Sequence, residues 1–308
     1  MLGNFRPVVY WSGANCQSST IFLLTSETSS GTLNSMSTAT DFLLHSQNID
    51  GGWGYRPGGM SYVEPTSAVM IALGNRAEQK RGLAFLISMQ HADGGWGIAP
   101  MDADSGWMTA WAVLALAQSP DTQSPVARGA QWLIATEGLR VTDAPSRAVI
   151  YQRLEIDSTL RGWPWQPGDA AWVHPTALAM LALAALGKSN DARIADGQVY
   201  LFDRALASGG WNIGNPEMLG KTVPATIQDT AMTLLALHAV GTSPSELHVS
   251  GALVFLNNAV ARAKTAAELA WGVYALYTWG VDSGDARKRL NALESDAGDW
   301  IRNPFVTA

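Results

Sequence analysis

Long stretches of the chain are apolar on every side, and these stretches resemble one another. Four of them align without gaps and share a leading threonine: Thr66–Leu73, Thr109–Leu116, Thr176–Leu183 and Thr230–Leu237. They are rich in Ala and Leu and carry almost no charge, which is the pattern of a helix buried on most of its surface. A fifth stretch, from Ala267 to Leu276, has the same character without the threonine.

A more amphipathic segment lies between successive buried stretches, for example from Glu78 to Gln90. Each of these segments is followed by a turn built on glycine and tryptophan. The turns are Gly51-Gly52-Trp53-Gly54, Gly94-Gly95-Trp96-Gly97, Gly162-Trp163-Pro164-Trp165 and Gly209-Gly210-Trp211-Asn212. The interval from Trp to Thr is 13 in the first three units (53 to 66, 96 to 109, 163 to 176) and 19 in the fourth (211 to 230). The chain is therefore a series of similar helical units.

Alternating buried and half-exposed helices predict an inner and an outer helical layer. Pro65 and Pro175 fit the first turn of two inner helices, where a missing N–H costs nothing. We predict an all-α fold, an α/α toroid of five to six helical hairpins, over residues 36–308. An open solenoid of the HEAT kind has a similar period, and it ranks second because it does not need a Gly–Trp turn in every unit. Residues 1–35 are rich in Ser and Thr, and we predict a poorly ordered segment there.

The second unit reads Arg81-Gly82-x2-Phe85-Leu86-x3-Gln90-x3-Gly94-x-Trp96. It resembles the QW motif of squalene–hopene and oxidosqualene cyclases, and the first unit keeps Gln47 and Trp53 at the same spacing. The resemblance extends over about residues 38–280 and implies the prenyltransferase and squalene-cyclase repeat fold. The residues themselves suggest a structural role for Gln47, Gln90, Trp53, Trp96 and Trp211. A glutamine amide can tie the end of its helix to neighbouring backbone, and an indole can stack over it.

The composition of the chain argues against several classes of protein. Hydrophobic residues make up 47% of the chain and charged residues 15%, which excludes a disordered protein. A net charge of −6 without a basic run argues against nucleic-acid binding. Cys16 is the single cysteine, so disulfides and zinc sites built on paired thiolates are excluded, and we expect neither a metal nor a cofactor.

The same features give an expectation for location. No apolar run approaches the ~18 residues of a membrane span, and we see no signal peptide. We therefore expect a cytoplasmic protein, with peripheral membrane contact and a homodimer left open.

In an α/α toroid, the N-termini of the inner helices surround one mouth of the ring. Two residues before each threonine, the four units carry Glu64, Trp107, His174 and Gln228. Class II terpene cyclases place their proton donor at this level, in the pattern Asp-x-Asp-Asp-Thr-Ala. The fourth unit reads Thr226-Ile227-Gln228-Asp229-Thr230-Ala231, so it keeps only the last acid, Asp229, and has Gln228 at the catalytic position.

Protonation of an alkene requires a neutral carboxylic acid in a dry site, where burial raises its pKa. Glu64 occupies the equivalent position in the first unit, and Asp102 with Asp104 lies in the loop before the second inner helix. We predict that Glu64, or Asp104 with Asp102, is the acid, and Asp229 stays a candidate. Each has a structural alternative: a first-turn acid for Glu64 and Asp229, and a solvated or capping loop acid for Asp102 and Asp104. His174 could orient a carboxylate or be a structural histidine.

Aromatic residues at helical spacing suggest a cavity wall suited to an isoprenoid or another apolar small molecule, where cation–π attraction would stabilise a carbocation. The predicted cavity-lining residues are Tyr62, Trp107, Trp111, Trp172, His174, Gln228, Trp271 and Tyr274. An ordinary core is the structural alternative. Two functions remain: a terpene-cyclase-like protein that cyclises or isomerises a polyprenyl substrate, and a non-catalytic toroid that binds a lipid or a protein.

Overall fold

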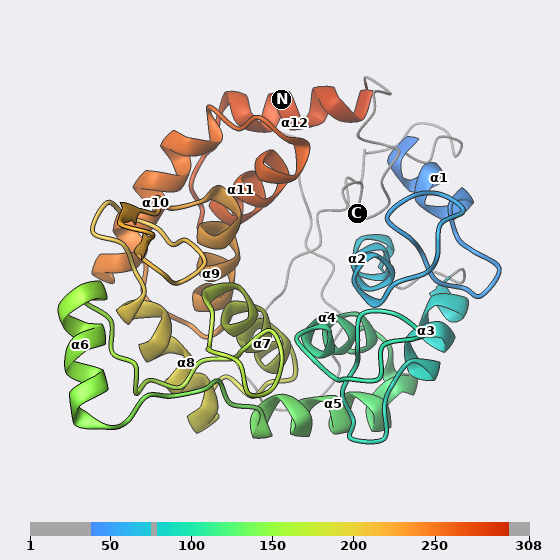
Figure 1. Ribbon diagram of the computed structural model, residues 1–308. Coiled ribbons are helices and arrows are strands. Elements are labelled where there is room, and N and C mark those ends of the chain that lie inside the picture. The colour runs from blue at the N-terminus through green and yellow to red at the C-terminus, as the bar shows by residue number, and fades with distance from the viewer. Residues whose placement is uncertain (1–37, 75–78, 296–308) are drawn as a thin grey trace.

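Two concentric layers of helices form a ring in the computed structural model, which describes residues 38–74 and 79–295 (Figure 1). The inner helices are α2 (Val63–Leu73), α4 (Met108–Leu116), α7 (Val173–Ala185), α9 (Ile227–Ala239) and α11 (Ala266–Thr278). The outer helices are α1 (Thr38–His45), α3 (Gln79–Ser88), α5 (Gln123–Ala135), α8 (Ala192–Asp203), α10 (Leu247–Val260) and α12 (Asp285–Ser295).

The inner helices follow one another around the ring in chain order. Helix α2 contacts α4, α4 contacts α7, α7 contacts α9, and α9 contacts α11. Each inner helix also packs on the outer helix that follows it, and α12 contacts α1, where the end of the outer layer meets its beginning. The fold is therefore the predicted α/α toroid, and the five inner helices lie at the five predicted buried segments.

The tryptophans of the glycine turns join the two layers in the same way four times. Trp53, Trp96, Trp163 and Trp211 are 0–2% exposed. Their indole Nε1 atoms donate to the carbonyls at the ends of the preceding outer helices, those of Leu43, Leu86, Leu133 and Leu201, at 2.6–2.7 Å. Their backbone N–H groups donate to the hydroxyls of the leading threonines, Thr66, Thr109, Thr176 and Thr230, at 2.8–2.9 Å. Each tryptophan thus fixes an outer helix to the start of the next inner helix.

The two glutamines of the repeat have the structural role that we expected. Gln47 donates to the carbonyl of Gly51 at 2.9 Å, and Gln90 donates to the carbonyls of Gly94 and Pro125 at 2.8 and 2.9 Å. Arg128 on α5 donates to the oxygen of Gln90, and Arg81 on α3 donates to that of Gln47. Each glutamine therefore links its own turn to the next unit.

The leading threonines should contribute measurably to stability because their hydroxyls accept from buried backbone. We expect Thr109→Val to lower the free energy of unfolding by about 1–3 kcal/mol, since the isosteric side chain leaves the N–H of Trp96 unsatisfied. Thr109→Ser, which keeps the oxygen, is the matched control and should lose less. Urea unfolding measures both variants. A loss in Thr109→Val that is no larger than the loss in Thr109→Ser would contradict the role given to the hydroxyl.

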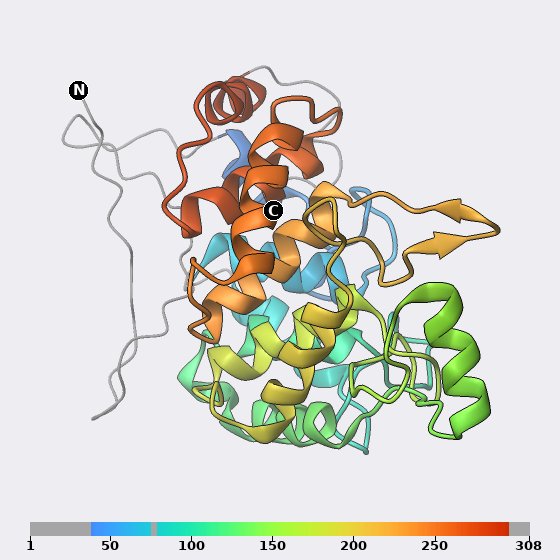
Figure 2. The same ribbon diagram turned by 90° about the vertical axis from the view of Figure 1, so that its left-hand side faces the viewer.

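Two insertions interrupt the repeat, and the sequence analysis did not predict either. Helix α6 (Ala144–Leu154) precedes α7 and has no buried residue. The strands β1 (Glu217–Met218) and β2 (Lys221–Thr222) pair as a hairpin before α9, which accounts for the longer interval in the fourth unit. Figure 2 shows both insertions projecting from the same side of the ring. A short 3-10 turn, η1 (Pro120–Thr122), precedes α5.

Two expectations from the sequence remain, one about the segment 1–35 and one about membrane crossing. The segment 1–35, which we predicted to be poorly ordered, lies outside the described residues. Among the described helices, none has the length and the apolar character needed to cross a bilayer.

Candidate functional site

The N-termini of the inner helices are covered by the turns of the following units. The first N–H of α2, that of Val63, donates to the carbonyl of Ile98, and the N–H of Val173 on α7 donates to the carbonyl of Ile213. The N–H of Trp107, just before α4, donates to the carbonyl of Trp165. All three distances are 3.0 Å. This contact replaces a side-chain cap, which α2, α4 and α7 lack. It also brings the turn of one unit over the N-terminus of the inner helix in the preceding unit.

The last two inner helices use a different cap because no Gly–Trp turn follows the fourth one. The Thr226 hydroxyl accepts from the N–H of Asp229 at the start of α9, and Thr265 forms a capping box with Glu268 at the start of α11. The start of α9 is therefore held by its own residues. This geometry fixes Asp229 in the first turn of α9.

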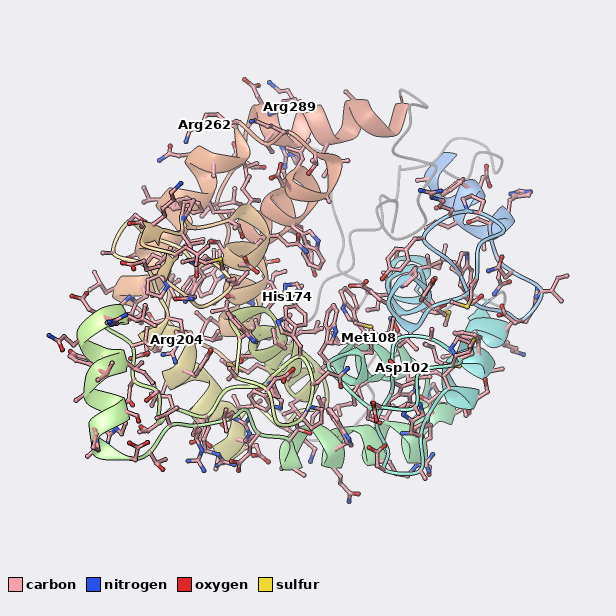
Figure 3. All side chains as sticks on the ribbon, viewed as in Figure 1. Asp102, Met108, His174, Arg204, Arg262 and Arg289 are labelled. Atoms are coloured by element: carbon pink, nitrogen blue, oxygen red, sulfur yellow. The ribbon has the colours of Figure 1, made fainter. Side chains whose placement is uncertain are left out.

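His174 lies at the centre of the side chains gathered at this mouth. It is 8% exposed and stands on the first turn of α7, near the middle of the ring in Figure 3. The ring of Trp165 stacks on it at 5.4 Å between centroids, and the ring of Trp107 meets it edge-on at 5.7 Å. Trp107 and Trp165 also contact each other in a T-shaped arrangement at 4.5 Å. Two indoles from neighbouring units thus enclose the imidazole.

Asp229 faces His174 from the next inner helix. Its Oδ1 lies 3.6 Å from the Nδ1 of His174, and its Oδ2 accepts a hydrogen bond from the Thr226 hydroxyl at 2.7 Å. Asp229 is only 7% exposed. The carboxylate therefore has one oxygen held by the cap and the other directed to the imidazole.

Glu64 is the second acid near His174, and its surroundings favour the neutral form. It lies on the first turn of α2 and accepts a hydrogen bond from the hydroxyl of Tyr55. Burial raises the pKa of Glu64 above its ordinary value, and the hydrogen bond from Tyr55 and the charge of His174 offset only part of this effect. Burial beside Glu64 also raises the pKa of the Tyr55 hydroxyl, so Tyr55 stays a donor. A partly buried carboxyl with a raised pKa is suited to general acid chemistry.

The other predicted acids lie elsewhere. Asp102 is half-buried in the loop before α4, where its carboxylate accepts from the N–H groups of Ile98 at 2.7 Å and Asp104 at 3.2 Å (Figure 3). Asp104 is exposed. Asp102 thus shapes the loop, and neither side chain joins the cluster around His174. Gln228, at the position of the family's acid, is also exposed.

The predicted aromatic residues divide into two groups. Tyr62 and Trp172 are the residues just before α2 and α7, and both are half-buried. Trp111 on α4 and Trp271 on α11 meet farther inside the ring, with 6.5 Å between their centroids. Tyr274 lies one turn beyond Trp271, and burial raises its pKa to about 12. The structure therefore places aromatic side chains both at the mouth and in the interior.

Comparison with known proteins relates part of the chain to one family. Residues 4–142 match the family of squalene-hopene cyclase C-terminal domains. The match begins within the segment 1–35 and ends after α5. The protein is squalene-cyclase-like. No curated protein matches its sequence.

Solved structures share the fold of this squalene-cyclase-like chain. The type II terpene cyclase MstE from Scytonema, without ligand, is 19% identical, with a TM-score of 0.55 over 85% of this chain and 78% of that one. A variant of MstE in complex with geranylgeranyl dihydroxybenzoate, its substrate, gives 19% identity and a TM-score of 0.59 over 85% and 77%. Another variant, with the product merosterolic acid A, gives 21% identity and a TM-score of 0.54 over 85% and 78%. At this identity the likeness establishes the fold alone.

Two residues of the squalene-cyclase-like mouth were missed by the sequence analysis. Tyr55 and Trp165 each lie two residues after the tryptophan of their turn, at 53 and 163. The same position holds Ile98 and Ile213 in the other units, whose carbonyls cap the inner helices. Trp165 ends the tetrad of the third unit and Tyr55 follows that of the first, so comparing this position across the units would have shown aromatic residues in two of them.

The candidate site is built from acids, an imidazole and indoles. Among the described residues, no group of three or more His, Cys, Asp or Glu side chains is placed to hold a metal ion. The chemistry that these residues can perform themselves is proton transfer beside an aromatic surface.

Proposed function

We propose that the protein protonates an alkene of an isoprenoid and so starts its cyclisation or isomerisation, with Glu64 as the acid. The observation that carries this proposal is the raised pKa of Glu64, which interacts with His174, the residue that Asp229 and two indoles contact. The terpene cyclase fold supports it, because MstE binds a geranylgeranyl substrate in the same fold.

The proton moves from the carboxyl of Glu64 to one carbon of the alkene, and the other carbon becomes a cation. Because Tyr55 donates to Oε2, Oε1 is the oxygen that carries the proton. The indoles of Trp107 and Trp165 enclose His174 at the same mouth, and an indole stabilises a cation by about 2 kcal/mol or more when water is excluded. The cation then loses a proton, which restores a neutral acid, so the product is an isomer of the substrate and no co-reactant is consumed.

His174 and Asp229 would act as positioning residues. Asp229 directs one carboxylate oxygen to the imidazole of His174, and the interaction with His174 lowers the pKa of Glu64. Burial has the opposite effect on the pKa of Glu64 and is the larger one. The net effect is a raised pKa, which increases the fraction of Glu64 that holds a proton at a given pH.

Product analysis tests the function. Cells that make the protein together with farnesyl, geranylgeranyl or squalene precursors are extracted and compared with cells carrying an empty vector, by gas chromatography–mass spectrometry. The proposal predicts a new product of the same composition as its isoprenoid precursor. An isoprenoid that co-purifies unchanged would instead identify a carrier, and no product and no bound lipid would favour a protein-binding toroid. Peripheral membrane contact and a homodimer stay predictions.

The hydroxyl of Tyr55 should tune the pH dependence of the reaction. Its hydrogen bond lowers the pKa of Glu64, so Tyr55→Phe should raise that pKa further. Activity requires the protonated acid, and it is lost as the pH rises through the pKa of Glu64. The alkaline limb of the pH–rate profile should therefore move to higher pH in Tyr55→Phe. Tyr62→Phe, in which the altered ring lies 5.2 Å from that of Tyr55, is the control and should leave the limb unchanged.

A further inference from the structure

The inner helices present three successive positions to the inside of the ring. The first of these, the mouth position, is Glu64, Trp107, His174, Gln228 or Ala267 in the five units. Residues four and seven places after it lie on the same helical face. The second positions, one turn below the mouth, are Ala68, Trp111, Leu178, Met232 and Trp271. The third positions are Ile71, Leu114, Leu181, Leu235 and Tyr274. We call these sets the middle layer and the lower layer.

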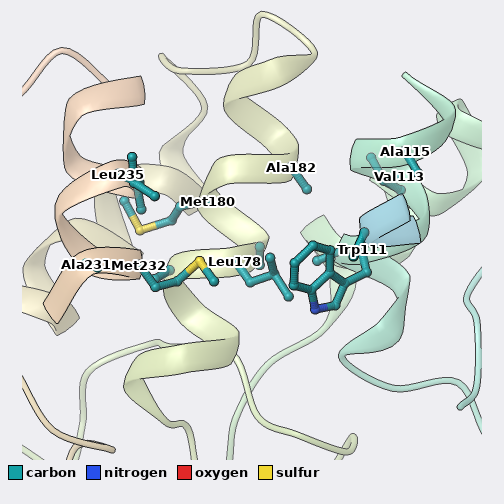
Figure 4. Close-up of a cluster of buried hydrophobic side chains, with 14 of the residues drawn as sticks. Trp111, Val113, Ala115, Leu178, Met180, Ala182, Ala231, Met232 and Leu235 are labelled. Carbon is teal, nitrogen blue, oxygen red and sulfur yellow. The ribbon is translucent and has the colours of Figure 1, made fainter. Parts of the chain in front are cut away.

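The contact between Trp111 and Trp271 shows that the middle layer reaches the centre of the ring. These residues stand on α4 and α11, and α7 and α9 lie between these two helices in the inner layer. Their rings nevertheless meet at 6.5 Å with an angle of 62° between the planes. Figure 4 shows Trp111, Leu178 and Met232 in one row across α4, α7 and α9. Two indoles and three aliphatic side chains therefore occupy one level of the interior.

Side chains of the middle layer are mostly buried. Four of its members are 1–8% exposed, namely Ala68, Trp111, Leu178 and Met232, and Trp271 is half-buried. Above them, His174 is buried, Glu64 and Trp107 are partly exposed and Gln228 is exposed. Below them, Leu235 is buried, whereas Ile71, Leu114, Leu181 and Tyr274 are partly exposed. The mouth and the lower layer therefore each include partly exposed side chains, and the contact of Trp111 with Trp271 lies between them.

The distance between the mouth and this contact is short. Four residues of an α-helix rise by about 6 Å, which is the depth from Trp107 to Trp111. Below the mouth, that depth accommodates only the end of an isoprenoid chain. The geometry points to Trp111 and Trp271 as the floor of the site, which limits the length of isoprenoid held below the mouth. This inference rests on the proposed function in taking the ligand to be an isoprenoid.

The floor has a measurable consequence for affinity. In the unaltered protein, isoprene units beyond the first few stay outside the interior and add little burial. Geranylgeraniol should therefore bind less than about threefold more tightly than geraniol, a far smaller gain than full burial of the added carbons would give. Removing either indole joins the mouth to the apolar lower layer. In Trp271→Ala and Trp111→Ala, the preference for geranylgeraniol should increase at least tenfold.

Equilibrium dialysis with radiolabelled geraniol, farnesol and geranylgeraniol measures these affinities without requiring turnover. Trp271 is half-buried, so Trp271→Ala remains informative if Trp111→Ala fails to fold. Tyr151→Ala, on the exposed helix α6, is the control and should keep the flat dependence on length. A steep length dependence in the unaltered protein, an unchanged dependence in both variants, or no binding of any of the three alcohols would overturn the inference. Binding with the predicted length dependence but without turnover would reject the proposed function and leave the floor standing.

Discussion

Glu64→Gln should reduce turnover by about 10³-fold or more, within the range that a general acid contributes. The amide has nearly the same shape as the carboxyl and can still accept the hydrogen bond from Tyr55, so the fold should persist. It has no acidic proton to give to an alkene. The measurement is product formation per enzyme by gas chromatography–mass spectrometry, with circular dichroism to verify the fold. Glu64→Asp, which keeps an acid at a shorter reach, should retain part of the activity.

The matched control for Glu64→Gln is Asp104→Asn. Asp104, with Asp102, was the alternative acid by sequence, but it is exposed in the loop before α4. Water stabilises its charged form, so its loss should leave turnover within about threefold of the unaltered protein, since exposed positions far from a site rarely matter. Full activity of Glu64→Gln would reject the assignment of the acid. Loss of activity in Asp104→Asn alone would move the acid to the loop.

Trp96→Ala should be among the most destabilising substitutions outside the site. Replacing a buried Trp by Ala costs about 3–5 kcal/mol, and a domain has only about 5–15 kcal/mol in total. Trp96 is 0% exposed, and its indole donates to Leu86 at 2.6 Å while its backbone donates to Thr109 at 2.9 Å. We therefore expect a large decrease in the urea midpoint, and partial unfolding at 37 °C.

Two further variants separate the loss of buried surface from the loss of the hydrogen bond, and control for removal of an aromatic ring. Trp96→Phe keeps most of the buried surface but loses the donor to Leu86, so it should lie between Trp96→Ala and the unaltered protein. Tyr151→Ala removes an aromatic ring that is 63% exposed on α6 and should change stability by less than about 0.5 kcal/mol. A loss below about 1 kcal/mol in Trp96→Ala would show that the tryptophan of the turn does not hold the two layers together.

The repeat in the sequence determined the architecture. Five buried segments with a Gly–Trp turn before four of them predict alternating inner and outer helices, because a helix that is apolar all round must be covered on all sides. The structure has its inner helices at those five segments, and its four tryptophans make the same bonds in every unit. The glutamine contacts were predictable for the same local reason: the partner backbone lies within a few residues.

The insertions were not predictable from the repeat. Helix α6 and the hairpin of β1 and β2 interrupt it, and their sequences follow no repeated pattern. Helix α6 buries none of its residues, so it leaves no apolar periodicity strong enough to mark its position beforehand.

The sequence also determined which side chains stand at the mouth, but not which of them work together. Alignment placed Glu64, Trp107 and His174 at equivalent positions, and it left Glu64 and Asp104 equal as candidate acids. Only the tertiary structure separates them, because burial and a pKa depend on what surrounds a carboxyl group and not on its place in a repeat. Glu64 is covered and lies near His174, whereas Asp104 faces solvent. The contact of Trp107 with His174 and the meeting of Trp111 with Trp271 likewise join residues far apart in the chain, since closing the ring brings distant helices to one centre.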